Sequence, residues 1–401
     1  MKTIKFLGFL LCICWQNTAQ NNIPHLAKNG NATQLMVANK PFLMIAGEVH
    51  NSSASTIEYM TPLFPKLKKM NLNSVFVTLA WEQFEPEEGV YDYTLVDAII
   101  ENAKKNDLKV CLLWFASWKN GESSYTPLWV KKNTKRFFRV KTKEGKEIET
   151  MSPFCEATKI ADAKAFAILM KHLKEVDTAQ TVILMQPQNE VGMFQDIDYN
   201  KVSLKLFEKK VPKTLISYLK KNKAHLDAYV KKAWSINNYK TKGTWKEVFG
   251  DTPEAKAFFT TWQYATYINY GAKTGRAAYN LPMMVNSWIV QRPEDLPGVY
   301  PNGVPVSRVI DIWKAAAPDI DIQSLDIYLS NFKEIVAMYD RDDNPLLVPE
   351  SKAEVSRAFY AFGEHDAICF SPFGIEDAAD NFVFTKSYEL LNEVQHLIKK
   401  I

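Results

Sequence analysis

Short apolar runs alternate with stretches of helical periodicity along most of this chain. Eight runs show little alternation with polar residues, which is typical of parallel strands covered on both faces. Between them, apolar side chains fall on one face of predicted helices over 95–103 and 166–176. This order predicts an α/β protein built as a (β/α)8 barrel, or TIM barrel. The predicted strands are Phe42–Gly47, Ser74–Ala80, Lys109–Ser117, Thr181–Gln186, Met283–Ile289, Ile322–Tyr328, Leu346–Pro349 and Ala367–Phe370.

The segment between the fourth and fifth runs is too long for one crossover helix. Its lysine-rich part, residues 201–242, carries apolar residues at helical spacing, as expected of helices with solvated outer faces. We therefore predict a helical insertion over about 201–279, after the fourth strand of the barrel.

The N-terminus has the pattern of a secretory signal. Two lysines precede the apolar run Phe6–Trp15, and Asn17–Ala19 offers a small-residue cleavage site. The run is too short to span a bilayer, and no other segment approaches that length. We predict a signal peptide over 1–19, a catalytic domain over 20–401, and a periplasmic or extracellular location.

Charge and composition exclude some classes of function. Removal of the two signal lysines lowers the formal net charge from +4 to +2, which gives no case for nucleic-acid or membrane binding. The remaining cysteines, Cys111, Cys155 and Cys369, are too few for a disulfide framework. The six histidines show no paired ligand spacing and no Gly-rich phosphate loop is present, so we expect neither metal nor cofactor. The oligomeric state is left open.

Polar residues gather where the predicted strands end. In a (β/α)8 barrel, the active site lies at the carboxyl ends of the strands. Seven polar ends that converge on one face predict a polar pocket with aromatic walls. These ends are Gly47–Asn51, Trp81–Gln83, Trp118–Asn120, Gln188–Glu190, Asn286–Trp288, Asp326–Tyr328 and Glu350–Lys352.

Two carboxylates stand out among these ends. Glu190 and Glu350 each end a buried run, on the fourth and seventh predicted strands. Two carboxyl groups in one pocket can divide labour, one held protonated as an acid and the other ionised as a nucleophile. This is the chemistry of a retaining glycosidase, and Asn189, just before Glu190, is placed to hydrogen-bond a sugar 2-hydroxyl. The alternative for Glu350 is a salt bridge to Lys352 or Arg357.

Several motifs carry a resemblance to a known family. "QPQNEVG" resembles the Gln-x-Glu-Asn-Glu-x-Gly motif of glycoside hydrolase family 35, the β-galactosidases of clan A. "GEVHN" resembles that family's first strand, "VTLAWEQFEPEEGVYDY" its second, and "LLVPES" its seventh. The similarity runs from Pro41 to about Phe373, and it implies a (β/α)8 glycosidase.

The resemblance also implies roles for individual residues. Glu190 corresponds to the acid/base, Glu350 to the nucleophile, and Asn189 to the 2-hydroxyl contact. It further implies that Tyr328 orients the nucleophile and that two tryptophans are candidates for an aromatic platform, namely Trp288 and Trp81.

The sugar-reading part of the site departs from the family 35 pattern. The third strand ends in "FASWKNGESSY", with Lys119 and Asn120 near the position of a galactose-binding glutamate, and Thr78 replaces a tyrosine. We expect Lys119 and Asn120 to contact substrate and His50 to hydrogen-bond in the pocket. For Glu48 the sequence leaves two roles open: a contact to a sugar hydroxyl, or an ion pair at the barrel mouth.

The sequence thus predicts a secreted retaining exo-β-glycosidase. The substrate implied by the resemblance is a terminal β-galactoside of plant cell-wall-type oligo- or polysaccharides. Three alternatives remain: a β-glucosidase, β-mannosidase or α-L-arabinofuranosidase of the same clan; a transglycosylase; and a non-catalytic sugar-binding barrel. Family members carry β-rich domains after the barrel, so a chain ending at Ile401 is expected to be a truncated relative or a piece of a longer one.

Overall fold

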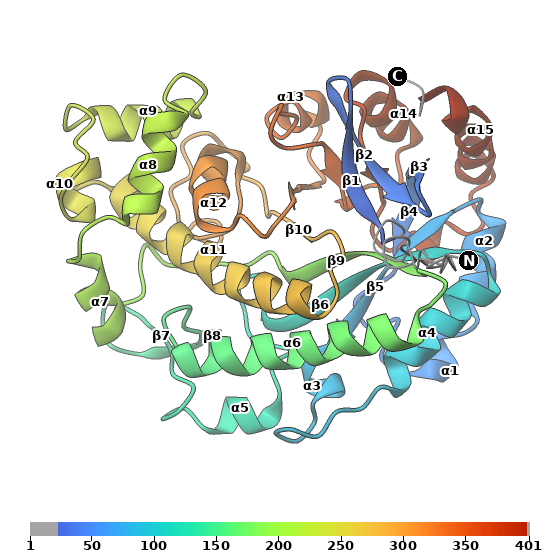
Figure 1. Cartoon of the computed structure of the whole chain (residues 1–401), viewed down its shortest axis with the longest axis horizontal. Coiled ribbons are helices and arrows are strands. Elements are labelled where there is room, and N and C mark those ends of the chain that lie inside the picture. Colours follow the sequence, from blue (N-terminus) through green and yellow to red (C-terminus); the bar gives the residue numbers. More distant parts are fainter. Residues whose placement is uncertain (1–22, 399–401) are drawn as a thin grey trace, which may run out of the picture.

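The computed structural model describes residues 23–398, and the predicted signal peptide lies outside this range. Parallel strands lie at the centre of the molecule (Figure 1), and their pairing makes a ring. All eight predicted strands are confirmed, although the fifth to eighth are short and the sixth and seventh are each split in two. In chain order they are β4 (Met44–Glu48), β5 (Ser74–Ala80), β6 (Lys109–Lys119), β9 (Val182–Asn189), β10 (Met284–Val285), β11 (Ile322–Gln323) with β12 (Asp326–Ile327), β13 (Leu347–Val348) with β14 (Glu350–Ser351), and β15 (Cys369–Phe370).

Strand pairing closes the ring. Six strands form one sheet in the order β13-β15-β4-β5-β6-β9, and a parallel bridge between Met185 and Met283 joins β9 to the segment that leads into β10. β10 pairs with β11, and β12 pairs with β14, in both cases parallel. Because all strands run in the same direction, their carboxyl ends meet at one mouth, as predicted.

Helices surround the ring. Helix α4 buries Val96, Ile99, Ile100 and Ala103, which confirms the predicted apolar face. These helices and the strands enclose the larger hydrophobic core. The helices outside the insertion are α1 (Ile57–Met60), α2 (Leu63–Lys69), α3 (Trp81–Phe84), α4 (Thr94–Lys105), α5 (Leu128–Lys132), α6 (Glu156–Val176), α12 (Ile310–Ala316), α13 (Phe332–Val336), α14 (Val355–Glu364) and α15 (Phe382–Ile398), with 3-10 turns at Ser307–Val309 and Ile375–Ala378.

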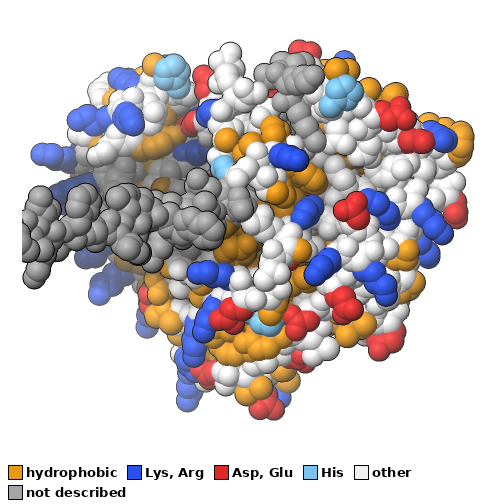
Figure 2. All heavy atoms as spheres, turned by 45° about the vertical axis from the view of Figure 1, so that its right-hand side comes forward, with side chains coloured by type: hydrophobic (Ala, Val, Ile, Leu, Met, Phe, Trp, Pro, Cys, Tyr) orange, Lys and Arg blue, Asp and Glu red, His pale blue; other side chains and the backbone are white. Residues whose placement is uncertain are grey.

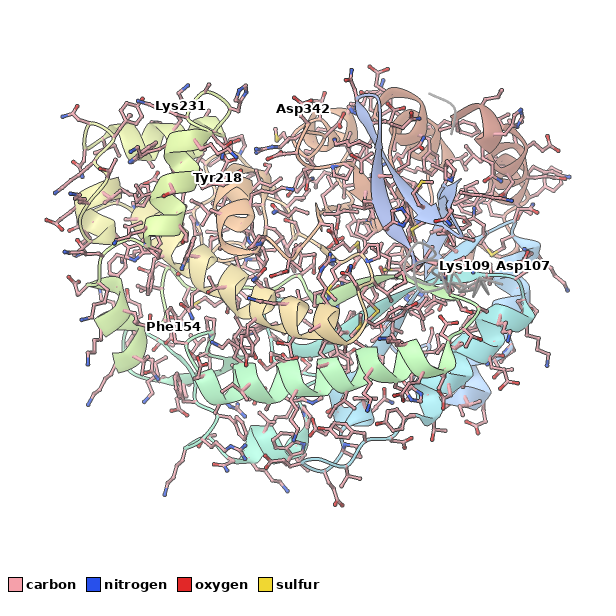
Figure 3. The ribbon with its side chains drawn as sticks, in the orientation of Figure 1. Asp107, Lys109, Phe154, Tyr218, Lys231 and Asp342 are labelled. Atoms are coloured by element: carbon pink, nitrogen blue, oxygen red, sulfur yellow. The ribbon has the colours of Figure 1, made fainter. Side chains whose placement is uncertain are left out.

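The predicted helical insertion is present after β9. Local signals fix its helix starts: Thr244 and Glu247 form a reciprocal capping box at α10, and Pro253 occupies the first turn of α11. Figure 3 shows Tyr218 and Lys231 in this insertion, on the opposite side of the molecule from Lys109 at the start of β6. Its helices are α7 (Lys201–Phe207), α8 (Lys213–Lys221), α9 (Ala228–Ser235), α10 (Trp245–Phe249) and α11 (Pro253–Ala278).

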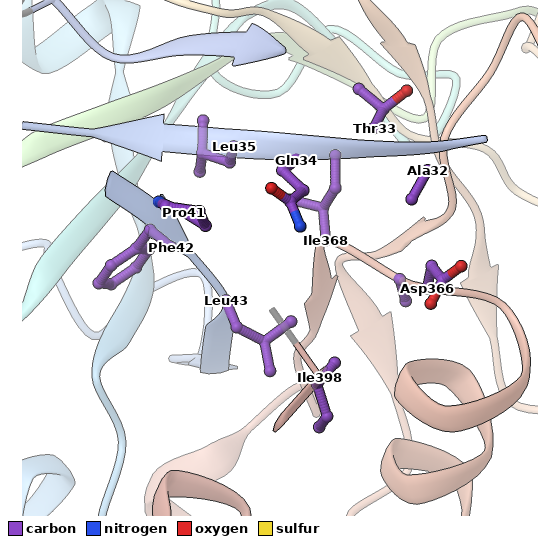
Figure 4. A pocket seen from close by; sticks show the side chains of 11 residues that line it. Ala32, Thr33, Gln34, Leu35, Pro41, Phe42, Leu43, Asp366, Ile368 and Ile398 are labelled. Atoms are coloured by element: carbon purple, nitrogen blue, oxygen red, sulfur yellow. The ribbon is translucent and has the colours of Figure 1, made fainter. Parts of the chain in front are cut away.

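Two small antiparallel sheets lie outside the barrel pattern. A hairpin of β7 (Arg139–Lys141) and β8 (Glu147–Met151) precedes α6. A three-stranded sheet of β1 (His25–Asn29), β2 (Ala32–Val37) and β3 (Lys40–Phe42) precedes the first barrel strand. Leu35 and Val37 of this sheet join the buried cluster that fills the barrel interior. A cavity of about 30 Å³ separates the sheet from the residues leading into β4 and β15, at the end of the barrel opposite the mouth (Figure 4).

The surface carries interspersed charges. Figure 2 shows lysines and arginines mixed with acidic side chains over the visible face. Among residues 23–398, none of the helices combines the length and the apolar character needed to cross a bilayer.

Candidate active site

A cavity of about 490 Å³ opens at the carboxyl ends of the barrel strands. Its lining comes from loops after most of the strands, so residues far apart in the sequence meet there. Six of the ten predicted site residues line it, namely Lys119, Asn120, Glu190, Trp288, Tyr328 and Glu350. The other lining residues are Asn51, Ile289, Gln291, Asp326, Leu329 and Phe373.

Glu190 directly follows β9 and is 8% exposed. Its φ of +39° lies in the left-handed region, which a residue with a side chain rarely adopts and which stores backbone strain at a site. Its backbone N–H donates to Asn286 Oδ1 at 2.9 Å, which compensates part of that strain by satisfying the buried amide. The chain therefore leaves the strand in a fixed direction with the carboxyl group toward the cavity.

Glu350 lies across the same mouth, three strands further round the ring than Glu190. It begins β14 and pairs in register with Asp326 of β12. The Tyr328 hydroxyl donates to Glu350 Oε2 at 2.8 Å, and the glutamate is 9% exposed. A hydrogen bond to an ionised carboxylate is stronger than one between neutral groups, so Tyr328 both orients Glu350 and favours its ionised form.

The two glutamates have different electrostatic surroundings. Burial, and then the nearby charge of Glu350, raises the pKa of Glu190 to about 8. Burial also raises the pKa of Glu350, but the Lys119 ammonium and the Tyr328 hydrogen bond oppose that rise. This arrangement favours the proton on Glu190 over Glu350, the division of roles that an acid and a nucleophile need.

Two further carboxyl groups stand beside this pair. Asp326 is 3% exposed, and burial followed by the charges of Glu350 and Glu190 holds its pKa well above the usual range. Glu48 is 1% exposed, and its pKa is raised well above the usual range by burial, then by Glu350. Because Lys119 is the cation that lowers the pKa of three of these groups, it compensates the charge of the cluster.

A chain of amides connects these groups beneath the cavity wall. The Nζ of Lys119 donates to Asn120 Oδ1 at 2.7 Å, and Asn189 Nδ2 donates to the same oxygen at 3.1 Å. Asn189 Oδ1 accepts from Asn286 Nδ2 at 2.8 Å, which also donates to Asp326 Oδ2 at 2.8 Å. The network locks the amide orientations, so Asn120 reaches the cavity while Asn189 supports it from behind.

Four of the predicted site residues do not line the cavity. Asn189 and Glu48 are both 1% exposed and lie behind its wall. The ring of His50 bonds Asp377 at 2.8 Å and contacts the edge of Phe373, so it supports a lining residue. The platform prediction for Trp81 is wrong, because its ring is fully buried against Trp129.

Sequence reasoning missed several residues of the site. The sequence pattern places Asp326 and Asn286 in polar strand ends but predicts no role for either of them. A carboxylate or amide within an otherwise apolar run was the signal that could have identified them. Asn51 likewise belongs to a predicted polar strand end without an assigned role, whereas Gln291, Leu329 and Phe373 lie in loops whose course the sequence pattern does not determine.

No group of three or more His, Cys, Asp or Glu side chains within residues 23–398 is arranged to hold a metal ion. The sequence-based expectation of a metal-free site remains a prediction.

Comparisons with known proteins identify the family. The sequence profile of glycoside hydrolase family 42, described as β-galactosidase, matches residues 57–346, well over half of the chain. No curated protein matches the sequence significantly.

Three solved structures share the fold at low sequence identity. The β-galactosidase from Bacillus circulans sp. alkalophilus is 17% identical with a TM-score of 0.58, and the alignment covers 88% of this chain and 56% of that one. The cold-adapted β-galactosidase from Rahnella sp. R3 is 14% identical with a TM-score of 0.58, over 89% and 57%. The β-amylase catalytic domain from Paenibacillus polymyxa is 10% identical with a TM-score of 0.60, over 87% and 98%.

The family comparison corrects the resemblance to family 35. The motifs behind that resemblance are an Asn-Glu pair after the fourth strand and a glutamate after the seventh, which are signals of the whole clan and do not separate its families. The present chain spans 56–57% of the length of the two β-galactosidases. It belongs to glycoside hydrolase family 42.

Proposed function

We propose that this chain is a retaining exo-β-glycosidase that releases terminal β-galactosyl groups. The observation that carries the proposal is the pair of buried glutamates, Glu190 and Glu350, which line one cavity but differ in their stabilising partners. Membership of a family described as β-galactosidase supports galactose as the sugar.

In the first step, Glu350 attacks the anomeric carbon while Glu190 gives its proton to the glycosidic oxygen. A glycosyl–Glu350 ester forms and the leaving group departs as an alcohol. The Tyr328 hydroxyl keeps the attacking carboxylate in place and ionised.

In the second step, Glu190, now ionised, removes a proton from water, and that water attacks the anomeric carbon. The bond to Glu350 breaks, the sugar leaves with its original anomeric configuration, and Glu190 is protonated again. Glu350 and Lys119 favour opposite protonation states of Glu190, which allows it to alternate between acid and base.

The proposal also covers the natural substrate and the location of the protein. We infer that the natural substrates are galactosides of plant cell-wall-type oligo- or polysaccharides, and the description of the family as β-galactosidase supports the galactosyl part of this inference. Export to the periplasm or beyond is supported by the charge and apolar pattern of residues 1–19.

The test is hydrolysis of nitrophenyl β-D-galactoside against the matching glucoside, mannoside and arabinoside, with Glu350→Gln assayed alongside. We expect turnover of the galactoside that the variant loses, and nuclear magnetic resonance of the first product should show the β-anomer. Activity near wild type in Glu350→Gln would exclude the nucleophile assignment. Turnover of only one of the other glycosides would support the same mechanism with a different sugar specificity. No turnover of any glycoside would favour a sugar-binding barrel.

A further inference from the structure

Two loops join beside the catalytic cavity and form a wall next to the lining residues Glu190 and Trp288. The loop after β9 and the loop that leads away from β10 exchange backbone hydrogen bonds between Met193 and Asn302, at 3.0 and 2.8 Å. The Asn302 side chain also donates to the carbonyl of Asp196 at 2.7 Å. Gly192 approaches Pro301 so closely that an added Cβ would lie 2.7 Å from its side chain. The wall is therefore held by paired backbone and tight packing.

This wall, which we call the aromatic wall, presents apolar side chains to solvent. Phe194 is 43% exposed, and its ring meets the ring of Trp288 edge to face at 5.9 Å, with an interplanar angle of 85°. Leu296 and Val299, which lie farther along the second loop, are 51% and 61% exposed. Exposed apolar side chains gathered beside a polar pocket are typical of a surface that binds a ligand.

The aromatic wall lies on the side of the cavity where the leaving group must depart. Phe194 follows Glu190 by four residues on the same loop, and Trp288 follows β10, the strand next to β9. The acid must contact the glycosidic oxygen, so the group attached to that oxygen extends past Glu190.

We propose that Phe194 and Trp288 form a subsite for the leaving group, and that the subsite takes a flat ring with an apolar face, either a second sugar ring or an aryl group. The proposal rests on the proposed function for the position of the acid. Stacking against such a ring contributes roughly a two- to tenfold gain in affinity.

The test compares non-hydrolysable ligands. Binding of methyl and phenyl 1-thio-β-galactoside is measured by calorimetry to wild type, Phe194→Ala and the control Phe359→Ala. Phe359 is 38% exposed on helix α14, and it belongs to neither of the two loops that carry Phe194 and Trp288. For wild type and for Phe359→Ala, we expect the phenyl ligand to bind more tightly than the methyl ligand. For Phe194→Ala, we expect most of this phenyl-to-methyl affinity ratio to be lost.

The proposal of this subsite is overturned if the phenyl-to-methyl affinity ratio is equal in wild type and Phe194→Ala. It is also overturned if wild type shows no preference for the phenyl ligand. An S-linked disaccharide measured alongside decides whether a sugar ring or an aryl group is preferred.

Failure of the proposed sugar is separable from failure of the subsite. If the nitrophenyl panel shows turnover of another glycoside only, the ligand pair is made with that sugar and the same ratio decides the matter. If no glycoside is hydrolysed, the proposed activity fails, while the phenyl-to-methyl ratio with the galactosides still supports or overturns the subsite.

Discussion

Replacing Glu190 with glutamine should stabilise the fold while it removes the proposed acid. Glu190 is buried beside other carboxyl groups, and its pKa is raised to about 8 from the usual 4.5. In the unfolded chain the carboxyl group ionises near its usual pKa, but in the folded chain it keeps its proton until the pH approaches 8. Between these two values the unfolded state binds fewer protons, so the free energy of unfolding falls as the pH rises.

The size of this effect follows from the shift. One pKa unit corresponds to about 1.36 kcal/mol, so Glu190 lowers stability by up to about 3 kcal/mol at pH 7 and by under about 1 kcal/mol at pH 5. Glutamine has nearly the same shape and cannot ionise. Glu190→Gln should therefore gain stability over wild type at pH 7, and the gain should shrink toward zero as the pH falls to 4.5.

Urea unfolding followed by tryptophan fluorescence at pH 4.5, 5.5 and 7 measures the difference. Glu208→Gln is the control, because Glu208 is exposed on the surface of the insertion. The reasoning is refuted if Glu190→Gln is as stable as wild type at all three pH values. It is also refuted if the stability of the variant relative to wild type falls as the pH rises. Loss of nitrophenyl galactoside turnover in the same variant checks the catalytic role separately.

Three further predictions concern Tyr328 and Lys119 beside the glutamate pair and Asp162, a buried carboxylate of helix α6. Tyr328→Phe removes a hydrogen bond to an ionised carboxylate, so kcat/KM should fall by about 10- to 150-fold and its acid limb should move to higher pH as the pKa of Glu350 rises. Lys119→Met removes the cation that lowers the pKa of Glu350 and Glu190, so both limbs of the pH profile should move to higher pH; unmoved limbs would contradict this. Asp162→Ala leaves several buried donors without their acceptor and should lower the free energy of unfolding by about 1.5–3 kcal/mol or more in urea titrations, because Trp114, Ser117 and Gln188 all donate to it.

The barrel could be predicted because its signals are local. Unalternating apolar runs such as Ser74–Ala80 and Thr181–Gln186 reappear as β5 and β9, and the helix faces follow the 3.6-residue period. The sheet of β1 to β3 was not anticipated, since its short strands carry mixed burial and gain their role by packing against the barrel interior.

Individual site residues were less predictable than strand ends. Trp81 and Trp288 both belong to polar ends of predicted strands, yet one ring is buried against Trp129 and the other lines the cavity. The direction in which a side chain points after a strand depends on the backbone turn and on neighbours from other elements, which no local pattern records.

The sequence by itself determined the strands, the helical insertion and the two glutamates that end buried runs. It did so because hydrophobic periodicity and the cost of burying a carboxylate are properties of neighbouring residues. The tertiary structure decided which polar groups share the cavity: Asp326 beside Glu350, Asn120 in front of Asn189, and Phe194 against Trp288. These contacts join loops from different strands, and only the closed ring brings those loops together.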